Sequence, residues 1–97
     1  MTALVAFRRK PSVVACELDG GSVLLDLETS RYFGLNAVGV AVWDMLASPH
    51  TTHELCTGIL NQFEVPEDRC RPDVERLMEQ MLERQLVERA AAAPENA

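Results

Sequence analysis

The stretch from Ser22 to Leu46 constrains the fold more than any other part of the chain. Its first half places the turn-forming residues Glu28-Thr29-Ser30 between two apolar runs, which predicts two strands, 23–27 and 31–35, joined by a tight turn. Asn36 follows directly. An asparagine at a helix start accepts a hydrogen bond from a backbone N–H that has no partner within the helix. The segment therefore predicts a hairpin that leads straight into a helix.

A third strand is expected before this hairpin. Residues 12–18 are rich in valine, and Asp19-Gly20-Gly21 is a strong signal for a turn between two strands. Three strands with short connections form an antiparallel meander, in which the first and third strands lie at the edges. The strand at 31–35 is therefore predicted to have one unpaired side.

Two helix starts and one buried stripe can be recognised in the next thirty or so residues. Gly39, Trp43 and Leu46 recur at helical spacing, so Trp43 is expected in the core and Gly39 at a close approach to the sheet. Thr51, with Glu54 three residues later, forms a capping box at the start of a second helix. These signals predict two short, amphipathic helices after the strands.

A third helix is expected to end near Leu86, with Pro72 close to an irregular first turn. Strands followed by helices indicate an α+β domain, here with a winged-helix-like order. We expect one domain over 12–89, a flexible arm over 1–11 and a disordered tail over 90–97. The apolar stripe of the third helix consists of Val74, Leu77, Met78, Met81 and Leu82.

The charge of the chain argues against nucleic acid as a partner. The net charge is −6, with a pI near 4.8 and Lys10 as the one lysine, whereas domains that bind nucleic acid are usually basic. A local patch of Arg69, Arg71 and Arg76 remains an open alternative. An acidic surface suits a basic peptide, for which Asp73 is one candidate contact. The other two candidate contacts are Glu75 and Glu79.

The location of the protein is expected to be cytosolic. Three cysteines, an odd number without regular spacing, fit free thiols in a reducing compartment. The first ten residues place their apolar part before their charges, the reverse of a secretory signal. No apolar run approaches the roughly 20 residues needed to span a bilayer, so no membrane association is predicted.

His50, His53 and Cys56 are candidates for a catalytic or metal site, because they are spaced three residues apart. A structural zinc site needs four ligands, and Cys70 is the one further candidate nearby. A nucleophilic cysteine needs a base, an orienting group and an oxyanion site, none of which the sequence indicates. A small hydrophobic role for Cys56 and a solvated position for His53 fit better. We therefore expect no enzyme, no metal and no cofactor.

One segment, DLETSRYFGLN followed by Gly39 and Trp43, resembles the PqqD-like family, also called the RiPP recognition element. The resemblance covers about residues 13–88. It implies that the leader of a ribosomally made precursor peptide binds as an added strand beside the third strand, in a cleft closed by the last helix. An edge strand offers free backbone donors and acceptors for such pairing.

The resemblance places the leader-binding site on two elements of this chain. On the strand, Tyr32 is expected to point away from Phe33 and Leu35 by strand alternation, and so to be partly exposed. The methionines of the last helix suit the facing wall, because they adapt to a guest side chain. Core packing is the competing role for these apolar residues. The implied site consists of Arg31, Tyr32, Phe33, Gly34, Leu35, Val74, Leu77, Met78 and Met81.

The segment resembles modules of lasso-peptide biosynthesis somewhat more than the chaperone of pyrroloquinoline quinone biosynthesis. The lasso resemblance implies a precursor leader peptide, a leader peptidase and an ATP-dependent macrolactam synthetase as partners. The alternative implies a radical-SAM enzyme. Two hypotheses from other classes stay open: a winged-helix regulator that binds DNA, and a structural subunit that docks onto an enzyme through its methionine-bearing helix.

Overall fold

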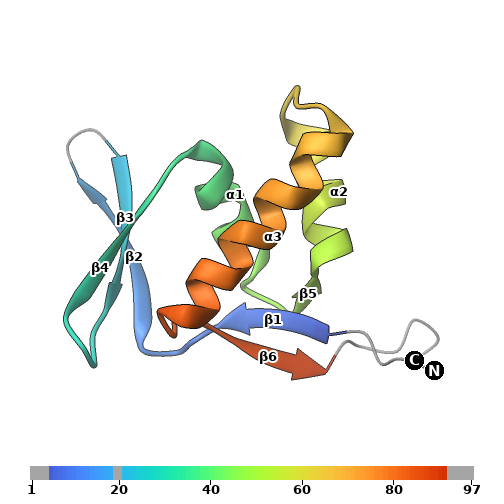
Figure 1. Cartoon of the computed structure of the whole chain (residues 1–97). Coiled ribbons are helices and arrows are strands. Elements are labelled where there is room, and N and C mark those ends of the chain that lie inside the picture. Colours follow the sequence, from blue (N-terminus) through green and yellow to red (C-terminus); the bar gives the residue numbers. More distant parts are fainter. Residues whose placement is uncertain (1–4, 19–20, 92–97) are drawn as a thin grey trace.

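The structure is a computed structural model that describes residues 5–18 and 21–91 of the 97-residue chain. One small sheet lies to the left of three helices and a second lies below them, and the last helix runs diagonally upward from the second sheet (Figure 1). In chain order the elements are β1 (Val5–Arg9), β2 (Val13–Leu18), β3 (Gly21–Asp26), β4 (Arg31–Leu35), α1 (Ala37–Met45), β5 (His50–Thr51), α2 (Thr52–Gln62), α3 (Glu67–Glu83) and β6 (Val87–Ala91).

The predicted meander is present as the sheet β2-β3-β4, with β2 and β4 at its edges. Leu24 of β3 lies opposite Ala15 on one side and Phe33 on the other, and its side chain is fully buried. Of the turn expected at Asp19-Gly20-Gly21, the first two residues fall outside the described residues, and Gly21 begins β3. With three helices after the meander, the α+β, winged-helix-like prediction is confirmed.

Asp26, at the end of β3, holds the turn that leads into β4. Its carboxylate accepts a hydrogen bond from the Glu28 N–H at 2.9 Å, and the Ser30 N–H bonds to its carbonyl at 2.7 Å. Burial by itself would raise the pKa of Asp26. The hydrogen bond from Glu28 outweighs burial, together with the neighbouring polar groups of Ser12 and Thr29 and the positive charge of Lys10, and leaves this pKa below its ordinary value. The charged carboxylate therefore stabilises the turn.

The first two helices begin where their capping residues predict. The Asn36 side chain accepts a hydrogen bond from the Gly39 N–H at 2.8 Å. Thr51 and Glu54 form the reciprocal pair of the capping box. A Cβ on Gly39 would lie 3.0 Å from Leu35 Cδ2, so the glycine permits a close approach to the last residue of β4.

Helix α3 differs from its prediction at both ends. It begins at Glu67, so Pro72 lies inside the helix and not near an irregular first turn. It ends at Glu83, before Leu86, because Gln85 adopts a left-handed conformation with φ 60°. The Leu86 N–H then reaches back to the Met81 carbonyl at 2.8 Å. This Schellman-type end turns the chain sharply into β6.

The second sheet, β5-β1-β6, corrects the predicted N-terminal arm. Within the expected arm, 5–9 form the central strand of this sheet, and the side chains of Ala6 and Phe7 are buried. The expected tail is likewise incorrect at Ala90, which pairs with Ala6 in β6. Residues 1–4 and 92–97 fall outside the described part. β1 pairs with strands that are distant in sequence, so local sequence patterns give no signal for this sheet.

The core joins the meander to the helices and the second sheet. Leu24, Trp43, Ile59 and Met81 come from four different elements, and each is at most 3% exposed. Arg9 of β1 lies over the Trp43 ring, 5.0 Å from its centroid, and donates to the Trp43 carbonyl at 2.9 Å. Trp43 is thus a core residue, as predicted. No helix in 5–18 or 21–91 has the length and apolar content to cross a membrane.

Candidate functional site

Strand β4 presents an open edge. Its residues pair with β3 on one side, and among the described residues no strand pairs with the other side. Alternate backbone N–H and C=O groups of such a strand point outward and remain available to another chain. The edge therefore has the backbone chemistry that strand addition requires.

The side chains of β4 divide between two faces. Phe33 and Leu35 point toward the helices and pack against the core, and both are half-buried. Tyr32 faces the other way and is 63% exposed, as alternation predicts. Arg31 and Gly34 are also exposed, and a Cβ on Gly34 would meet no atom within 4 Å. A chain lying along this edge would thus meet aromatic and aliphatic groups on its helix side.

The helical wall of the expected cleft is narrower than predicted. Val74, Met78 and Met81 are at most 2% exposed and pack into the core, because the widest apolar stripe of α3 faces inward. Leu77 is half-buried and lies at the boundary between core and surface. Of the four predicted wall residues, Leu77 is the one with surface available to a guest.

A hollow of about 270 Å³ lies between the start of α1 and α3, next to the end of β4. At the middle of β4, the Arg84 guanidinium lies over the Phe33 ring, 5.5 Å from its centroid. The hollow and the Arg84–Phe33 contact define a cleft between β4 and α3, which we call the β4–α3 cleft. The hollow is lined by Asn36, Val38, Asp73, Val74, Arg76, Leu77 and Gln80.

Several residues of this cleft were not predicted as site residues. Val38 is the second residue of α1. Arg76 and Gln80 of α3 and its C-cap residue, Arg84, recur at intervals of four. That spacing places them on one face of the helix, which was the available signal. Of the acidic residues considered as contacts, Asp73 lines the cleft.

The other two acidic candidates lie elsewhere. Glu75 and Glu79 both line a depression beside Phe7 and Thr52, and Glu75 also lines the hollow between α2 and α3. Neither of them lines the hollow of the β4–α3 cleft. They belong to faces of α3 that turn away from β4, so the interpretation of Glu75 and Glu79 as leader contacts is not supported by their positions.

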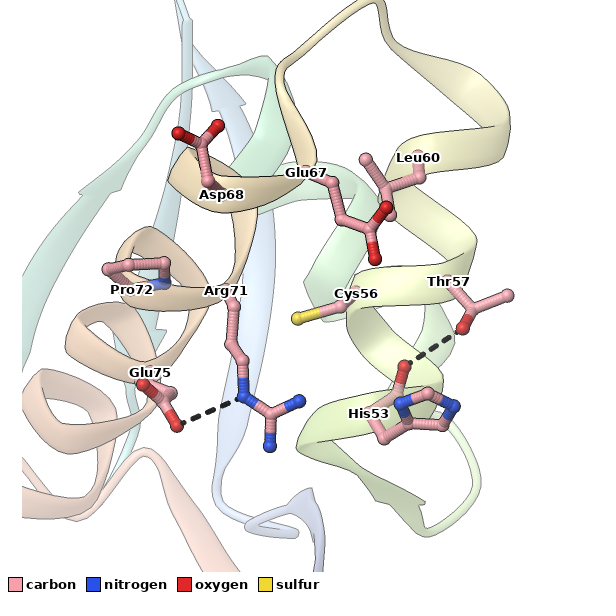
Figure 2. A pocket seen from close by; sticks show the side chains of 9 residues that line it. All are labelled: His53, Cys56, Thr57, Leu60, Glu67, Asp68, Arg71, Pro72 and Glu75. Atoms are coloured by element: carbon pink, nitrogen blue, oxygen red, sulfur yellow. Dashed lines mark hydrogen bonds and ion pairs between the residues drawn. The ribbon is translucent and has the colours of Figure 1, made fainter.

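A larger hollow, about 610 Å³, lies between α2 and α3 (Figure 2). The Cys56 sulfur points toward α3, and the His53 ring lies away from it. Burial, together with the neighbouring Cys70, raises the pKa of the Cys56 thiol to about 11, so it stays protonated at neutral pH. The lining consists of His53, Cys56, Thr57, Leu60, Glu67, Asp68, Arg71, Pro72 and Glu75.

This second hollow lacks the arrangement that either chemical hypothesis requires. A nucleophile acts as the thiolate, which the raised pKa of Cys56 disfavours. His50 Nδ1 lies 2.9 Å from the Ser48 carbonyl oxygen, within its own loop. Within the described ranges, no group of three or more His, Cys, Asp or Glu side chains is placed to hold a metal ion. The β4–α3 cleft is therefore the better candidate site.

Comparison with solved structures gives two close matches to this fold. One is a complex of TbiB1 with the TbiA(beta) leader peptide, with a TM-score of 0.73 and 28% identity, covering 88% of this chain and 99% of that one. The other is lasso peptide synthetase B1 complexed with the leader peptide, with a TM-score of 0.71 and 23% identity, covering 84% and 96%. At 23% identity, the second match shows a shared fold and no more.

Comparison with protein families gives one match, and a search of curated proteins gives none. The matching family is described as coenzyme PQQ synthesis protein D (PqqD), and the match covers residues 21–87. This range runs from the start of β3 to the start of β6, so it includes the open edge and all three helices. The chain belongs to the PqqD family.

Proposed function

We propose that this protein binds the leader of a ribosomally synthesised precursor peptide, which adds as a strand beside β4. The observation that carries the proposal is the open edge of β4 next to α3, in a chain 28% identical to a protein solved with a leader peptide. Backbone pairing supplies affinity in such complexes, and pockets for alternate side chains supply specificity.

Each predicted site residue has a defined part in this proposal. Arg31, Tyr32, Phe33, Gly34 and Leu35 supply the backbone edge, and Leu77 supplies apolar contact in the hollow. Val74, Met78 and Met81 support the cleft floor from within the core. The leader's apolar side chains then enter the hollow beside Leu77, while its backbone pairs with β4.

The protein performs no chemistry itself in this proposal. It holds the precursor and presents the remainder of the peptide to a leader peptidase and a macrolactam synthetase of lasso-peptide biosynthesis, within the cytoplasm. Tethering in this way raises the effective concentration of the substrate at its enzymes. The lasso setting is favoured by the resemblance of the segment DLETSRYFGLN, and one solved structure of the same fold is a lasso peptide synthetase B1. The family description favours the alternative, a peptide chaperone of pyrroloquinoline quinone biosynthesis.

The direct test is fluorescence polarisation with labelled leader peptides from precursor genes near this gene, of both the lasso and the quinone type. A leader methylated at successive backbone nitrogens gives the sharpest readout, because a strand pairs through alternate N–H groups. We expect methylation to abolish binding at every second position along the paired segment. Uniform tolerance of methylation would refute strand addition.

A pair of protein variants supplies the complementary test. Gly34→Pro removes a backbone donor from β4, whereas Gly34→Ala keeps the donor and places its Cβ in open space. We expect the alanine variant to bind and the proline variant to lose binding, with the fold checked by circular dichroism. Absence of binding to every leader tested would refute the recognition function, and salt-sensitive DNA binding would then favour the regulator hypothesis.

A further inference from the structure

The face of α3 that borders the β4–α3 cleft is basic, although the whole chain carries a net charge of −6. Arg76 and Gln80 line the hollow, and Arg84 lies over Phe33, so one row of side chains spaced by four residues runs the length of the cleft. Arg31 lies two residues before Phe33 and so shares its face of β4, opposite Asp26 of β3.

The charges in this row are unequally compensated. Arg76 lies 3.9 Å from Asp73, and both side chains are more than half exposed. In the described part of the chain, no carboxylate lies within ion-pair distance of Arg31 or Arg84. The uncompensated positive charge is therefore at the Phe33 end of the cleft, while the hollow at the other end already contains an acid.

We propose that the leader carries an acidic side chain opposite Arg84 and Arg31, in addition to the apolar side chain that enters the hollow at Leu77. The proposal rests on the proposed function and specifies the chemistry of its ligand. A guanidinium binds a carboxylate through two parallel hydrogen bonds, and its stacking on Phe33 restricts its orientation. An acid beside Asp73 would meet a like charge, so the Phe33 end is the favoured position.

The spacing of the two leader residues follows from the helix. Leu77 and Arg84 are seven positions apart in sequence, which corresponds to about 10 Å along a helix axis. A strand rises about 3.3 Å per residue, so this distance equals about three residues. Since every second side chain of a strand shares a face, the acid is expected about two or four residues from the apolar one.

The role of this contact is to set the register of the leader. The net charge of −6 repels an acidic peptide at long range, so the pair does not accelerate the encounter. At contact distance, however, a complementary charge fixes which residues of the two strands face each other. This proposal differs from the expectation of a basic leader, which considered the charge of the whole surface and not of the cleft.

The test uses labelled leaders from the precursor gene beside this gene, each with one acidic residue changed to lysine. Binding is measured by fluorescence polarisation at low salt to the native protein, Arg84→Glu and the control Arg71→Glu. Arg71 is exposed, pairs with Glu75 and lines the hollow on the other side of α3, so its variant makes the same charge change away from the cleft. Circular dichroism checks the helix in each variant, with Arg84→Gln as a milder substitution.

We expect Arg84→Glu to weaken native leader binding about fivefold, and Arg71→Glu to leave it unchanged. One of the lysine-substituted leaders should bind the native protein less tightly than the unchanged leader does. The same substituted leader should bind the Arg84→Glu variant more tightly than it binds the native protein. If the leader binds but Arg84→Glu and Arg71→Glu behave alike, or if the bound segment contains no acid, the acidic contact is refuted while leader recognition stands. If no leader binds the native protein, both proposals fail.

Discussion

Phe7→Ala tests whether the N-terminal segment is part of the folded domain. Phe7 is 8% exposed and lies in the middle strand of the sheet β5-β1-β6, where it packs against the core. Truncating a buried phenylalanine to alanine removes its transfer free energy and leaves a cavity. A flexible arm would tolerate the same change without loss of stability.

The expected cost follows from this burial. Core Phe→Ala substitutions reduce the free energy of unfolding by about 3–5 kcal/mol. For Phe7→Ala we expect a reduction of about 3 kcal/mol, because the Phe7 side chain is not completely buried. A small domain has roughly 5–15 kcal/mol in total, so a large share is lost. For a chain of this size each kcal/mol lowers Tm by about 4–8 °C, which gives a decrease of at least about 12 °C.

Urea unfolding followed by fluorescence measures this effect, because the single tryptophan, Trp43, is 3% exposed in the folded state. Arg8→Ala is the matched control on the same strand. Its ion pair with Glu88, at 2.7 Å, is exposed and contributes at most about 1 kcal/mol. A Phe7→Ala variant as stable as the control would refute the placement of β1 in the core.

Two further predictions concern titrating groups. Asp26→Asn should reduce the free energy of unfolding above the ordinary pKa of 3.8, and the difference from the native protein should disappear as the pH falls through the lowered pKa of the folded state. Urea titrations across this pH range measure the difference, and a difference that grows in acid would contradict the assignment. A Cys16→Ser variant keeps two thiols, Cys56 and Cys70, and both are buried. The folded variant should react slowly with Ellman's reagent at about pH 8, because a pKa of about 11 leaves about one thiolate in a thousand at Cys56. Unfolding in guanidinium chloride should release both thiols, and a fast native reaction would show that one of them is accessible.

The parts of the fold that were predicted correctly depend on neighbouring residues. Asn36 and Thr51 cap the helices that immediately follow them, and each cap is decided within four residues of sequence. Trp43 lies on a stripe that any helix of this pattern would bury. Because these signals are local, the meander and the starts of two helices could be predicted from the sequence.

The second sheet depends on contacts between distant residues. Phe7 in β1 pairs with Arg89 in β6 and with His50 in β5, and neither partner segment has the pattern of a strand. Strand formation depends on such tertiary contacts more than on intrinsic propensity. The end of α3 was not predicted, because its left-handed residue is Gln85. A glycine at this position would have indicated the end of the helix.

The candidate site was predicted in part for the same physical reason. The open edge follows from strand order, so 31–35 could be located without knowledge of the packing. The face of α3 that borders this edge could not be predicted, because Leu77 and Met78 are adjacent in sequence and both are apolar. The packing buries Met78 and leaves Leu77 at the surface, and it brings Arg84 to Phe33.

The pairing of β1 with β6 has a consequence for how this protein can be joined to others. Val5 lies directly opposite Ala91 in the ladder, so the two limits of the described chain are neighbours, about 5 Å apart. They lie on the opposite side of the molecule from β4 (Figure 1). A fluorescent tag or a whole enzyme domain can therefore be attached at either limit, and the two limits can even be joined by a short linker, without obstructing the cleft.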